Sequence, residues 1–236
     1  MKIYYYFALA LFFISCDDTS IKEQNNSTVT HFKIAKEKEE LPFNSANPFD
    51  EAGTIHNEIL TNYYSHYPLL TDTDSIINLF HAKAKEHSFF SSLTTSPILS
   101  NELNLLLSQP ENMLEDFLQS SDLSEKAKIS LSVYIEELLF YTYSSDNYAI
   151  IYDYITDYEN TIATDSLYSS DEKAIILTIT SITRHSVYMK KKRPKKNTDP
   201  DWDWLTTNIV GATAGTNGDT QKAIYTALVA GIIENR

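Results

Sequence analysis

The amino-acid sequence predicts an all-α fold: a multi-helix bundle that ends in a C-terminal helical hairpin. Three observations support this prediction. Apolar residues recur three and four positions apart in segment after segment, which is the spacing that gives a helix one buried face. Residues typical of helix starts precede several of these segments. The chain of 236 residues contains only five glycines and seven prolines, which argues against a turn-rich all-β protein.

The bundle is expected to occupy residues 47–189. Its first helix is predicted to begin at Asn47, with Pro48 at the first helical position, because asparagine is a favoured N-cap and proline fits there. Further helices are predicted at residues 74–87, 97–107 and 110–118, from Asp122 onward, and after a cap formed by Ser145 and Asp146. In the helix that follows Asp122, the residues expected to face inward are Ala127, Leu131, Tyr134, Ile135, Leu138 and Tyr141.

The last segment of the bundle, residues 174–182, is apolar almost all round. Its isoleucine and threonine content would also suit a strand. Ser169 and Glu172 have the spacing of a capping box, and the pattern continues to Met189, so a helix is favoured. Because a helix that is apolar on every side must be buried, we expect it to be the central member of the bundle.

Two regions of different composition follow the bundle. Residues 190–201 carry a basic run followed by aspartates and are expected to form a solvated charged linker, with contact to anionic lipid or surface polysaccharide as the alternative. Residues 202–236 contain four of the five glycines and an apolar run at 223–233. The spacing of Gly211 and Gly215 allows close helix packing, so we expect a helical hairpin packed on the bundle rather than inserted in a membrane.

The first 16 residues have the features of a bacterial lipoprotein precursor. Lys2 precedes an apolar run at 3–14, about 18 Å long as a helix and too short for the ~30 Å hydrocarbon core of a bilayer. The ending Phe13-Ile14-Ser15-Cys16 looks like a lipobox, although leucine is usual where Phe13 stands. We therefore predict a signal peptide at residues 1–15 and lipidation of Cys16. An ordinary secretion signal followed by a free thiol is the alternative.

The anchor predicted at Cys16, the only cysteine, sets the expected location and partners. Residues 16–46 are polar and aperiodic, which indicates a flexible tether between the lipid and the fold. A lipidated Cys16 would hold the protein in the cell envelope, attached to a bacterial membrane through its acyl chains. The expected partners are that membrane and another envelope protein. The net charge of −13 repels nucleic acid, which is not an expected partner.

No motif for catalysis or metal binding is complete in the sequence. Asp199, Asp201 and Asp203 resemble the opening of a calcium loop, but Trp204 and Val210 stand where that loop needs glycine and glutamate. The sequence has no His-Glu-x-x-His motif, phosphate-binding loop or Gly-x-Ser-x-Gly elbow. We therefore predict no metal site, no cofactor and no recognisable set of catalytic residues.

Three ionisable residues, His56, Glu159 and Arg184, lie on or beside the apolar faces of their predicted helices. We predict that they form a buried polar cluster, because an unpaired buried charge is costly and must find a partner. At least two of the three are expected within hydrogen-bond or salt-bridge distance, with no solvent-open pocket around them. A structural polar tie or exposure at a helix edge is the favoured interpretation, and a ligand site or acid–base centre is the alternative.

Three short motifs resemble segments of small helical lipoproteins of Bacteroidota-type bacteria. They are Asn47-Pro48-Phe49-Asp50 with Gly53, His56 and Asn57, then Glu172-Lys173 leading to Ser181–Ser186, and the small-residue tail near Gly211. The resemblance covers residues 47–236 thinly, and because these lipoproteins are uncharacterised it implies no activity. In similar lipoproteins, acidic residues after the cysteine, here Asp17 and Asp18, act as a surface-export signal. A different bacterial sorting rule interprets Asp17 as a signal for inner-membrane retention.

The sequence leaves three functions open. The leading hypothesis is a non-enzymatic, envelope-anchored helical module that contacts another protein or a ligand. The second is a hydrolase or lyase that acts on envelope material through His56, Glu159 and Arg184. The third is a membrane-active or immunity-type protein that uses the C-terminal tail. A cleft that joins the three ionisable residues would favour the enzyme, and an exposed apolar patch on the tail would favour the third hypothesis.

Overall fold

The computed structural model describes residues 41–67, 70–93, 96–145, 147–190, 192–193, 201–216 and 219–235. All of them belong to one compact unit, Glu39–Arg236. The predicted signal peptide, the lipidation site Cys16 and the predicted tether up to residue 40 lie outside the described residues.

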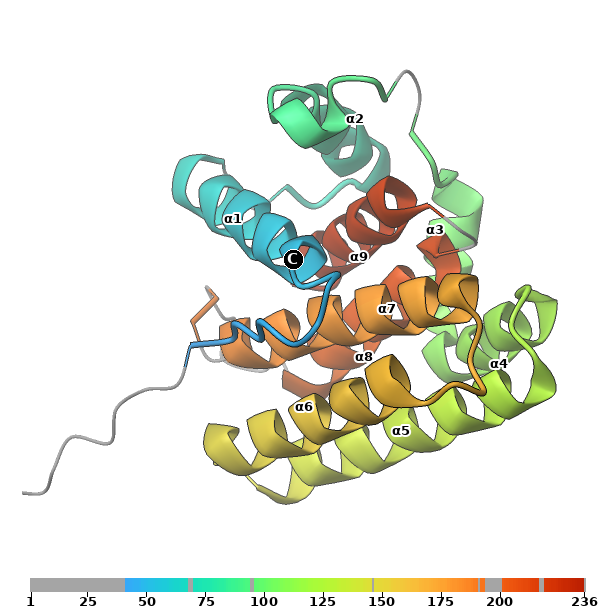
Figure 1. The fold of residues 1–236 in the computed structure, drawn as a ribbon. Coiled ribbons are helices and arrows are strands. Elements are labelled where there is room, and N and C mark those ends of the chain that lie inside the picture. The colour runs from blue at the N-terminus through green and yellow to red at the C-terminus, as the bar shows by residue number, and fades with distance from the viewer. Residues whose placement is uncertain are drawn as a thin grey trace, which may run out of the picture. The chain divides into compact units, whose positions relative to one another are not determined.

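Every regular element among the described residues is helical, which confirms the predicted all-α fold (Figure 1). A short 3₁₀ helix, η1 (Ser88–Phe90), lies between the second and third α-helices. The α-helices are α1 (Glu51–His66), α2 (Thr73–Ala84), α3 (Ser100–Ser108), α4 (Pro110–Ser120), α5 (Glu125–Ser144), α6 (Tyr148–Thr164), α7 (Ser170–Met189), α8 (Asp201–Gly215) and α9 (Thr220–Glu234).

The predicted start of the first helix is wrong by three residues. Helix α1 begins at Glu51, and Asn47 lies in the turn before it, where its Oδ1 accepts a hydrogen bond from Phe49 N at 2.8 Å. The side-chain amide of Asn47 donates instead to Glu159 on α6, at 2.8 Å. A contact across 112 positions of sequence therefore fixes Asn47, and helix-start statistics cannot detect such a contact.

Other helix boundaries agree with the prediction in part. Pro110 opens α4, and the capping box of α7 is confirmed, with Glu172 N donating to Ser169 Oγ at 3.2 Å and Ser169 N donating to Glu172 Oε2 at 2.8 Å. The predicted cap of α6 is wrong, because Asn147 caps that helix through a hydrogen bond from Ala149 N to its Oδ1. Helix α2 ends three residues earlier than predicted, and α3 begins three residues later.

Helix α7 is a helix rather than a strand, and it is buried along most of its length. It lies between α1 and α6 in Figure 1 and also packs against α8 and α9. Its isoleucines at 176, 179 and 182 are almost fully buried. The segment predicted to be the central member of the bundle therefore has that position.

Helices α8 and α9 form the predicted C-terminal hairpin. Gly211 permits their close approach, because a Cβ atom there would lie 2.9 Å from the Cα atom of Ala227. Helices α1, α2, α3 and α7 pack on α9, and α3, α4, α5 and α7 pack on α8. The hairpin is therefore enclosed by the other helices. Within the described residues, no helix is both long and apolar enough to cross a membrane.

Two residues of the predicted solvated linker are buried, contrary to the prediction. Lys190 donates a hydrogen bond from Nζ to Thr142 O at 3.2 Å. Arg193 forms a salt bridge with Asp201 at 2.9 Å, and its guanidinium lies 4.7 Å from the centre of the Trp204 ring. The long stems of lysine and arginine can cover apolar surface, which the basic character of the run does not indicate. Residues 191 and 194–200 lie outside the described residues.

Candidate functional site

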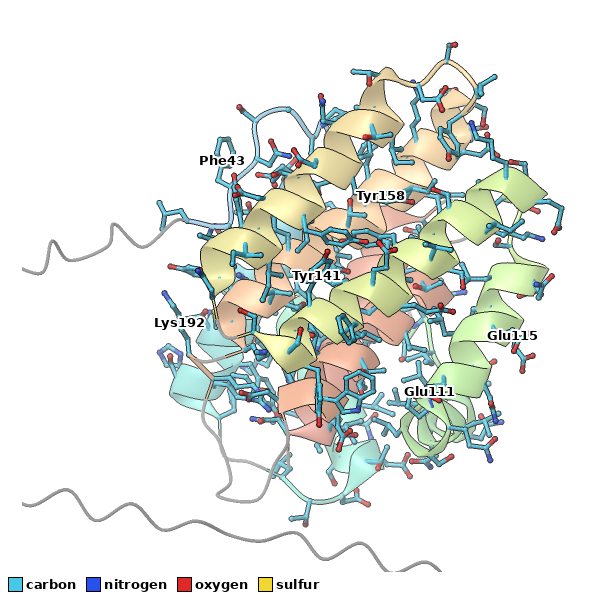
Figure 2. All side chains as sticks on the ribbon, turned by 90° about the horizontal axis from the view of Figure 1, so that it is seen from below. Phe43, Glu111, Glu115, Tyr141, Tyr158 and Lys192 are labelled. Carbon is cyan, nitrogen blue, oxygen red and sulfur yellow. The ribbon has the colours of Figure 1, made fainter. Side chains whose placement is uncertain are left out.

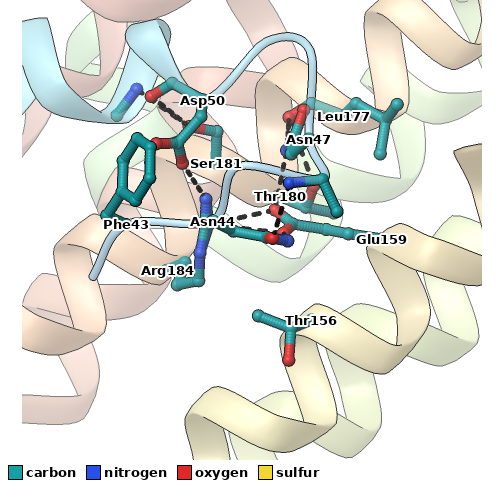
Figure 3. A network of polar contacts seen from close by, with 12 residues as sticks. Phe43, Asn44, Asn47, Asp50, Thr156, Glu159, Leu177, Thr180, Ser181 and Arg184 are labelled. Atoms are coloured by element: carbon teal, nitrogen blue, oxygen red, sulfur yellow. Dashed lines mark hydrogen bonds and ion pairs between the residues drawn. The ribbon is translucent and has the colours of Figure 1, made fainter. Parts of the chain in front are cut away.

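Arg184 on α7 is the centre of a buried polar network (Figure 3). Its Nη1 donates to both carboxylate oxygens of Glu159 on α6, each at 3.3 Å. Its Nη2 donates to Asp50 Oδ1, at the residue before α1. One guanidinium thus pairs with two carboxylates from different parts of the chain, and all three side chains are buried.

The segment that leads into α1 completes this network. Asn44 Nδ2 donates to Glu159 Oε2 at 2.6 Å, and Asn47 Nδ2 donates to Glu159 Oε1 at 2.8 Å. Ser181 Oγ on α7 donates to Asp50 O at 3.0 Å. These bonds connect the segment 44–50 to α6 and α7. We call this group of hydrogen-bonded residues the Arg184 network. It comprises Asn44, Asn47, Asp50, Glu159, Ser181 and Arg184.

His56 is buried as predicted, but it contacts neither Glu159 nor Arg184 through a hydrogen bond among the described residues. Its Nε2 lies 3.0 Å from Asn208 Oδ1 on α8, and Asn208 Nδ2 donates to Trp204 O at 2.7 Å. Because the amide nitrogen of Asn208 is engaged there, its oxygen faces Nε2 of His56, while Nδ1 of His56 lies 3.3 Å from Asn57 Oδ1. Of the three residues in the predicted cluster, the structure joins Glu159 and Arg184, and it places His56 in a separate contact between α1 and α8.

Burial and pairing shift the pKa values of these groups in different directions. Burial raises the pKa of Glu159, and the charge of Arg184 and the asparagine amides oppose that shift only in part. Burial would also raise the pKa of Asp50, but its contacts with His185 and Arg184 outweigh burial and lower it. Burial lowers the pKa of His56 to about 4. The folded protein therefore favours neutral His56 and ionised Asp50.

Sequence reasoning missed Asp50, His185 and Asn208. Asp50 precedes α1 instead of lying in its first turns, and His185 lies next to Arg184 on α7, with its Nε2 3.6 Å from Asp50 Oδ1. Asn208 lies in the C-terminal segment, which was interpreted only from its glycines and its apolar run. The one available signal was that Asp50 and His185 lie inside the short motifs on which the resemblance to small helical lipoproteins depends.

The geometry of the Arg184 network is that of a structural tie. Arg184 and Glu159 have at most 1% of their surface exposed, so no substrate can reach their reactive atoms in this conformation. Asp50 Oδ2 and Arg184 Nε are buried without a hydrogen-bond partner among the described residues. The described residues contain no group of three histidine, cysteine or acidic side chains that could hold a metal ion. The network can fix the segment 44–50 in place, but it offers no open site.

An open site lies on another face of the bundle, between α4 and α5. This groove has a volume of about 1000 Å³, at the upper end of the range for ligand pockets. Its floor includes Trp202 and Thr206 of α8, and α4 contributes Leu114 and Leu118. Four large apolar residues of α5 in its lining are exposed: Ile129 (63%), Val133 (47%), Phe140 (67%) and Tyr143 (81%). We call this surface the α4–α5 groove.

The exposed residues of the groove form a second apolar stripe on α5. Ile129, Val133, Phe140 and Tyr143 follow one another at spacings of four, seven and three, which places them on one helix face. The predicted inward stripe lies on the opposite face, where Leu131, Tyr134 and others are buried, although Tyr141, also predicted to face inward, is 37% exposed. Sequence reasoning assigned the buried stripe and missed the exposed one, although its spacing is equally visible.

Carboxylates surround this apolar surface. Glu111 and Glu115 lie on α4 beside α5, as Figure 2 shows, and α5 contributes Glu125 and Glu136 to the lining. The one cation of the lining, Lys128, donates to Gln119 O at 2.8 Å and lies 3.6 Å from Glu125. Within the described part of the chain, Glu111, Glu115 and Glu136 form no salt bridge. The groove therefore combines exposed apolar side chains with carboxylates, and one of these, Glu136, lies on the exposed face of α5 between Val133 and Phe140.

Comparison with protein-family models, curated proteins and solved structures found no match for the chain. The Arg184 network and the α4–α5 groove are therefore the features from which a function can be inferred.

Proposed function

We propose that this chain is a non-enzymatic, envelope-anchored helical module that binds another protein through the α4–α5 groove. The observation that carries the proposal is the exposed apolar stripe on α5. Four large side chains on one helix face, each at least 47% exposed, line the groove together with Leu114 and Trp202. Such exposed apolar surfaces with polar rims are typical of protein-interaction sites.

The two alternative functions have less support. A hydrolase or lyase would need its acid and base in a cleft, whereas Glu159 and Arg184 are sealed in the core and His56 is separate from them. A membrane-active tail would need an exposed apolar patch. The described apolar residues of α9 are instead buried beneath α1, α2, α3 and α7. Neither alternative has an accessible site among the described residues.

The anchor is part of the proposal, and Cys16 is the residue that tests it. Replacing Cys16 with serine removes the predicted acceptor of the acyl chains and should release the protein from membranes while the helical unit stays folded. Membrane fractionation after a salt wash measures the release, and circular dichroism checks the fold. If the Cys16→Ser protein still sediments with membranes, the anchor lies elsewhere.

Binding through the groove can be tested with a pair of matched variants. Val133→Glu places a charge in the middle of the exposed stripe, and Ile150→Glu places the same charge on α6, at a residue that is 51% exposed and outside the groove. Each protein is expressed at the same level and isolated from intact envelopes after mild cross-linking. We expect one partner to co-purify with the wild type and with Ile150→Glu, and to be lost with Val133→Glu. Equal recovery with both variants would contradict the proposal.

A further inference from the structure

The shape of the α4–α5 groove determines what kind of backbone can occupy it. Its walls and floor come from α4, α5 and α8, whose backbone groups are engaged in their own helical hydrogen bonds. An extended strand would find no free sheet edge to pair with, so recognition must depend on side chains. Along α5, the lining runs from Glu125 to Tyr143, about 27 Å at the rise of an α-helix. A helix of about five turns fits this length.

The charged residues of the groove determine which charge its occupant should carry. Four glutamates and one lysine line it, and the lysine is already bonded to Gln119 O. A partner that covers the exposed stripe would bring its own side chains against these carboxylates, and Glu136 lies on the stripe itself. Lysine or arginine in those positions would be attracted, and aspartate or glutamate would be repelled. The aromatic rings of Phe140, Tyr143 and Trp202 also suit cationic side chains.

A second copy of this chain is a poor occupant for the same reason. In a symmetric dimer through this face, the same glutamates would oppose one another, and each chain carries a net charge of −13. The surface of an anionic membrane would be repelled as well.

We infer that the α4–α5 groove binds a basic amphipathic helix of a partner protein. The apolar face of that helix packs on Ile129, Val133 and Phe140, and its lysine or arginine side chains pair with the glutamates that line the groove. The inference rests on the proposed function, because it names the kind of partner that the same groove takes.

The test uses the lipidated full chain in nonionic detergent and three synthetic peptides of about 18 residues, the length that spans the groove as a helix. The first is an amphipathic Leu–Lys helix, the second has glutamate in place of each lysine, and the third is a scrambled Leu–Lys peptide without an apolar face. Fluorescence anisotropy measures the affinity, after subtraction of binding to protein-free micelles. We expect the Leu–Lys helix to bind at least about tenfold more tightly than the scrambled peptide, and the Leu–Glu helix not to bind.

Variants separate groove binding from general attraction to an acidic protein. Val133→Glu adds a negative charge, so it should strengthen a purely electrostatic attraction but weaken docking on the apolar stripe. We expect it to weaken Leu–Lys binding by about tenfold, while Ile150→Glu leaves binding within about twofold. The pair Glu115→Gln and Glu136→Gln should weaken binding by about fivefold and reduce its salt dependence.

Three outcomes would overturn the inference: equal binding of the scrambled peptide, stronger binding with Val133→Glu, or a dimer in sedimentation that Val133→Glu dissociates. These outcomes differ from failure of the proposed function. If the partner is still lost from Val133→Glu in intact envelopes but the Leu–Lys helix does not bind, the groove is a protein-binding site for another kind of partner. If no partner depends on Val133, the proposed function itself fails.

Discussion

The Arg184 network places charges where a helical bundle usually has apolar side chains, whereas the α4–α5 groove places apolar side chains where a bundle usually has charges. In the network, Arg184, Glu159 and Asp50 have at most 8% of their side-chain surface exposed. In the groove, Phe140 and Tyr143 are 67% and 81% exposed.

The difference between the two regions teaches which unusual residues are available for function. Buried charges are held by one another, and their removal is felt by the fold. Exposed apolar residues contribute little to the fold, and a group of them on one face is typical of an interaction surface. Substitutions in the two regions should therefore have opposite consequences, with large effects on stability in the network and large effects on binding in the groove.

The largest effect is expected from Arg184→Met. Without the guanidinium, Asp50 and Glu159 lose their shared cation while both stay buried, so the free energy of unfolding should fall by roughly 3–5 kcal/mol. Urea denaturation measures the change. The matched control is Lys126→Met, which breaks the exposed pair with Asp165 and should cost less than about 1 kcal/mol. Similar losses for the two variants would show that burial does not distinguish these ion pairs.

A pH-dependent effect of intermediate size is expected from His56. The pKa of His56 is about 4 in the folded protein and has its ordinary value of 6.5 in the unfolded chain. Between pH 4 and pH 6.5, the unfolded chain therefore binds more protons at this residue than the folded protein does. Stability should therefore fall as the pH is lowered from 6.5 to 4, by up to about 3 kcal/mol from this residue. His56→Gln keeps a hydrogen-bond donor for Asn208 and should flatten the decline.

The comparison of His56→Gln with the wild type isolates this residue from its neighbours. Glu159 acts in the opposite direction, because its raised pKa makes the folded protein bind a proton more readily than the unfolded chain above the ordinary value of 4.5. Asp50, whose pKa is lowered, loses its contribution only below 3.8. Unfolding curves of both proteins at several pH values give the two profiles, and parallel profiles would contradict the assignment to His56.

A smaller effect is expected from Glu159→Gln. The glutamine keeps the shape of the side chain but presents one amide nitrogen, so either Asn44 or Asn47 loses its acceptor. The loss in stability should be about 1–3 kcal/mol, less than for Arg184→Met, because Asp50 still pairs with Arg184. Glu136→Gln in the groove is the matched control and should stay within about 0.5 kcal/mol of the wild type. Thermal unfolding of both variants measures the two losses of stability, and equal losses would contradict the prediction.

The smallest effect on stability is expected from Phe140→Ala. Its side chain is 67% exposed, so truncation should change the free energy of unfolding by less than about 0.5 kcal/mol. Binding of the Leu–Lys helix should nevertheless weaken by about tenfold, since exposed aromatic residues are frequent anchors of interfaces. A stability loss above about 2 kcal/mol with unchanged binding would show that Phe140 supports the fold instead of binding a partner. That result would contradict the difference drawn between the groove and the Arg184 network.

The sequence was sufficient for features that depend on neighbouring residues. The capping box at Ser169 and the apolar run after it predict α7, and the small residues near Gly211 predict the close packing of the hairpin. The pairing of Glu159 and Arg184 was also accessible, because both lie on buried helix faces and buried charges must pair.

Features that depend on tertiary structure could not be predicted in the same way. Asn47 was assigned to a helix cap because asparagine is common at that position. Its contact with Glu159, 112 residues away in sequence, is not visible to such local rules. The groove escaped prediction for a related reason. Helix α5 carries two apolar stripes on opposite faces, and periodicity alone does not say which one the other helices cover. The structure answers that question by placing α6 on one side and leaving Ile129 and Val133 exposed on the other.

Site-specific photo-cross-linking in intact envelopes tests the central claim most directly. A photo-reactive residue is placed singly at Ile129, Val133 and Phe140 in the groove, and at Ile150 and Leu167 as exposed apolar controls outside it. The account predicts the same adduct, of one size, from the three groove positions and none from the two controls. Adducts from Ile150 or Leu167 with none from the groove would contradict it and would place the interaction surface elsewhere on the bundle.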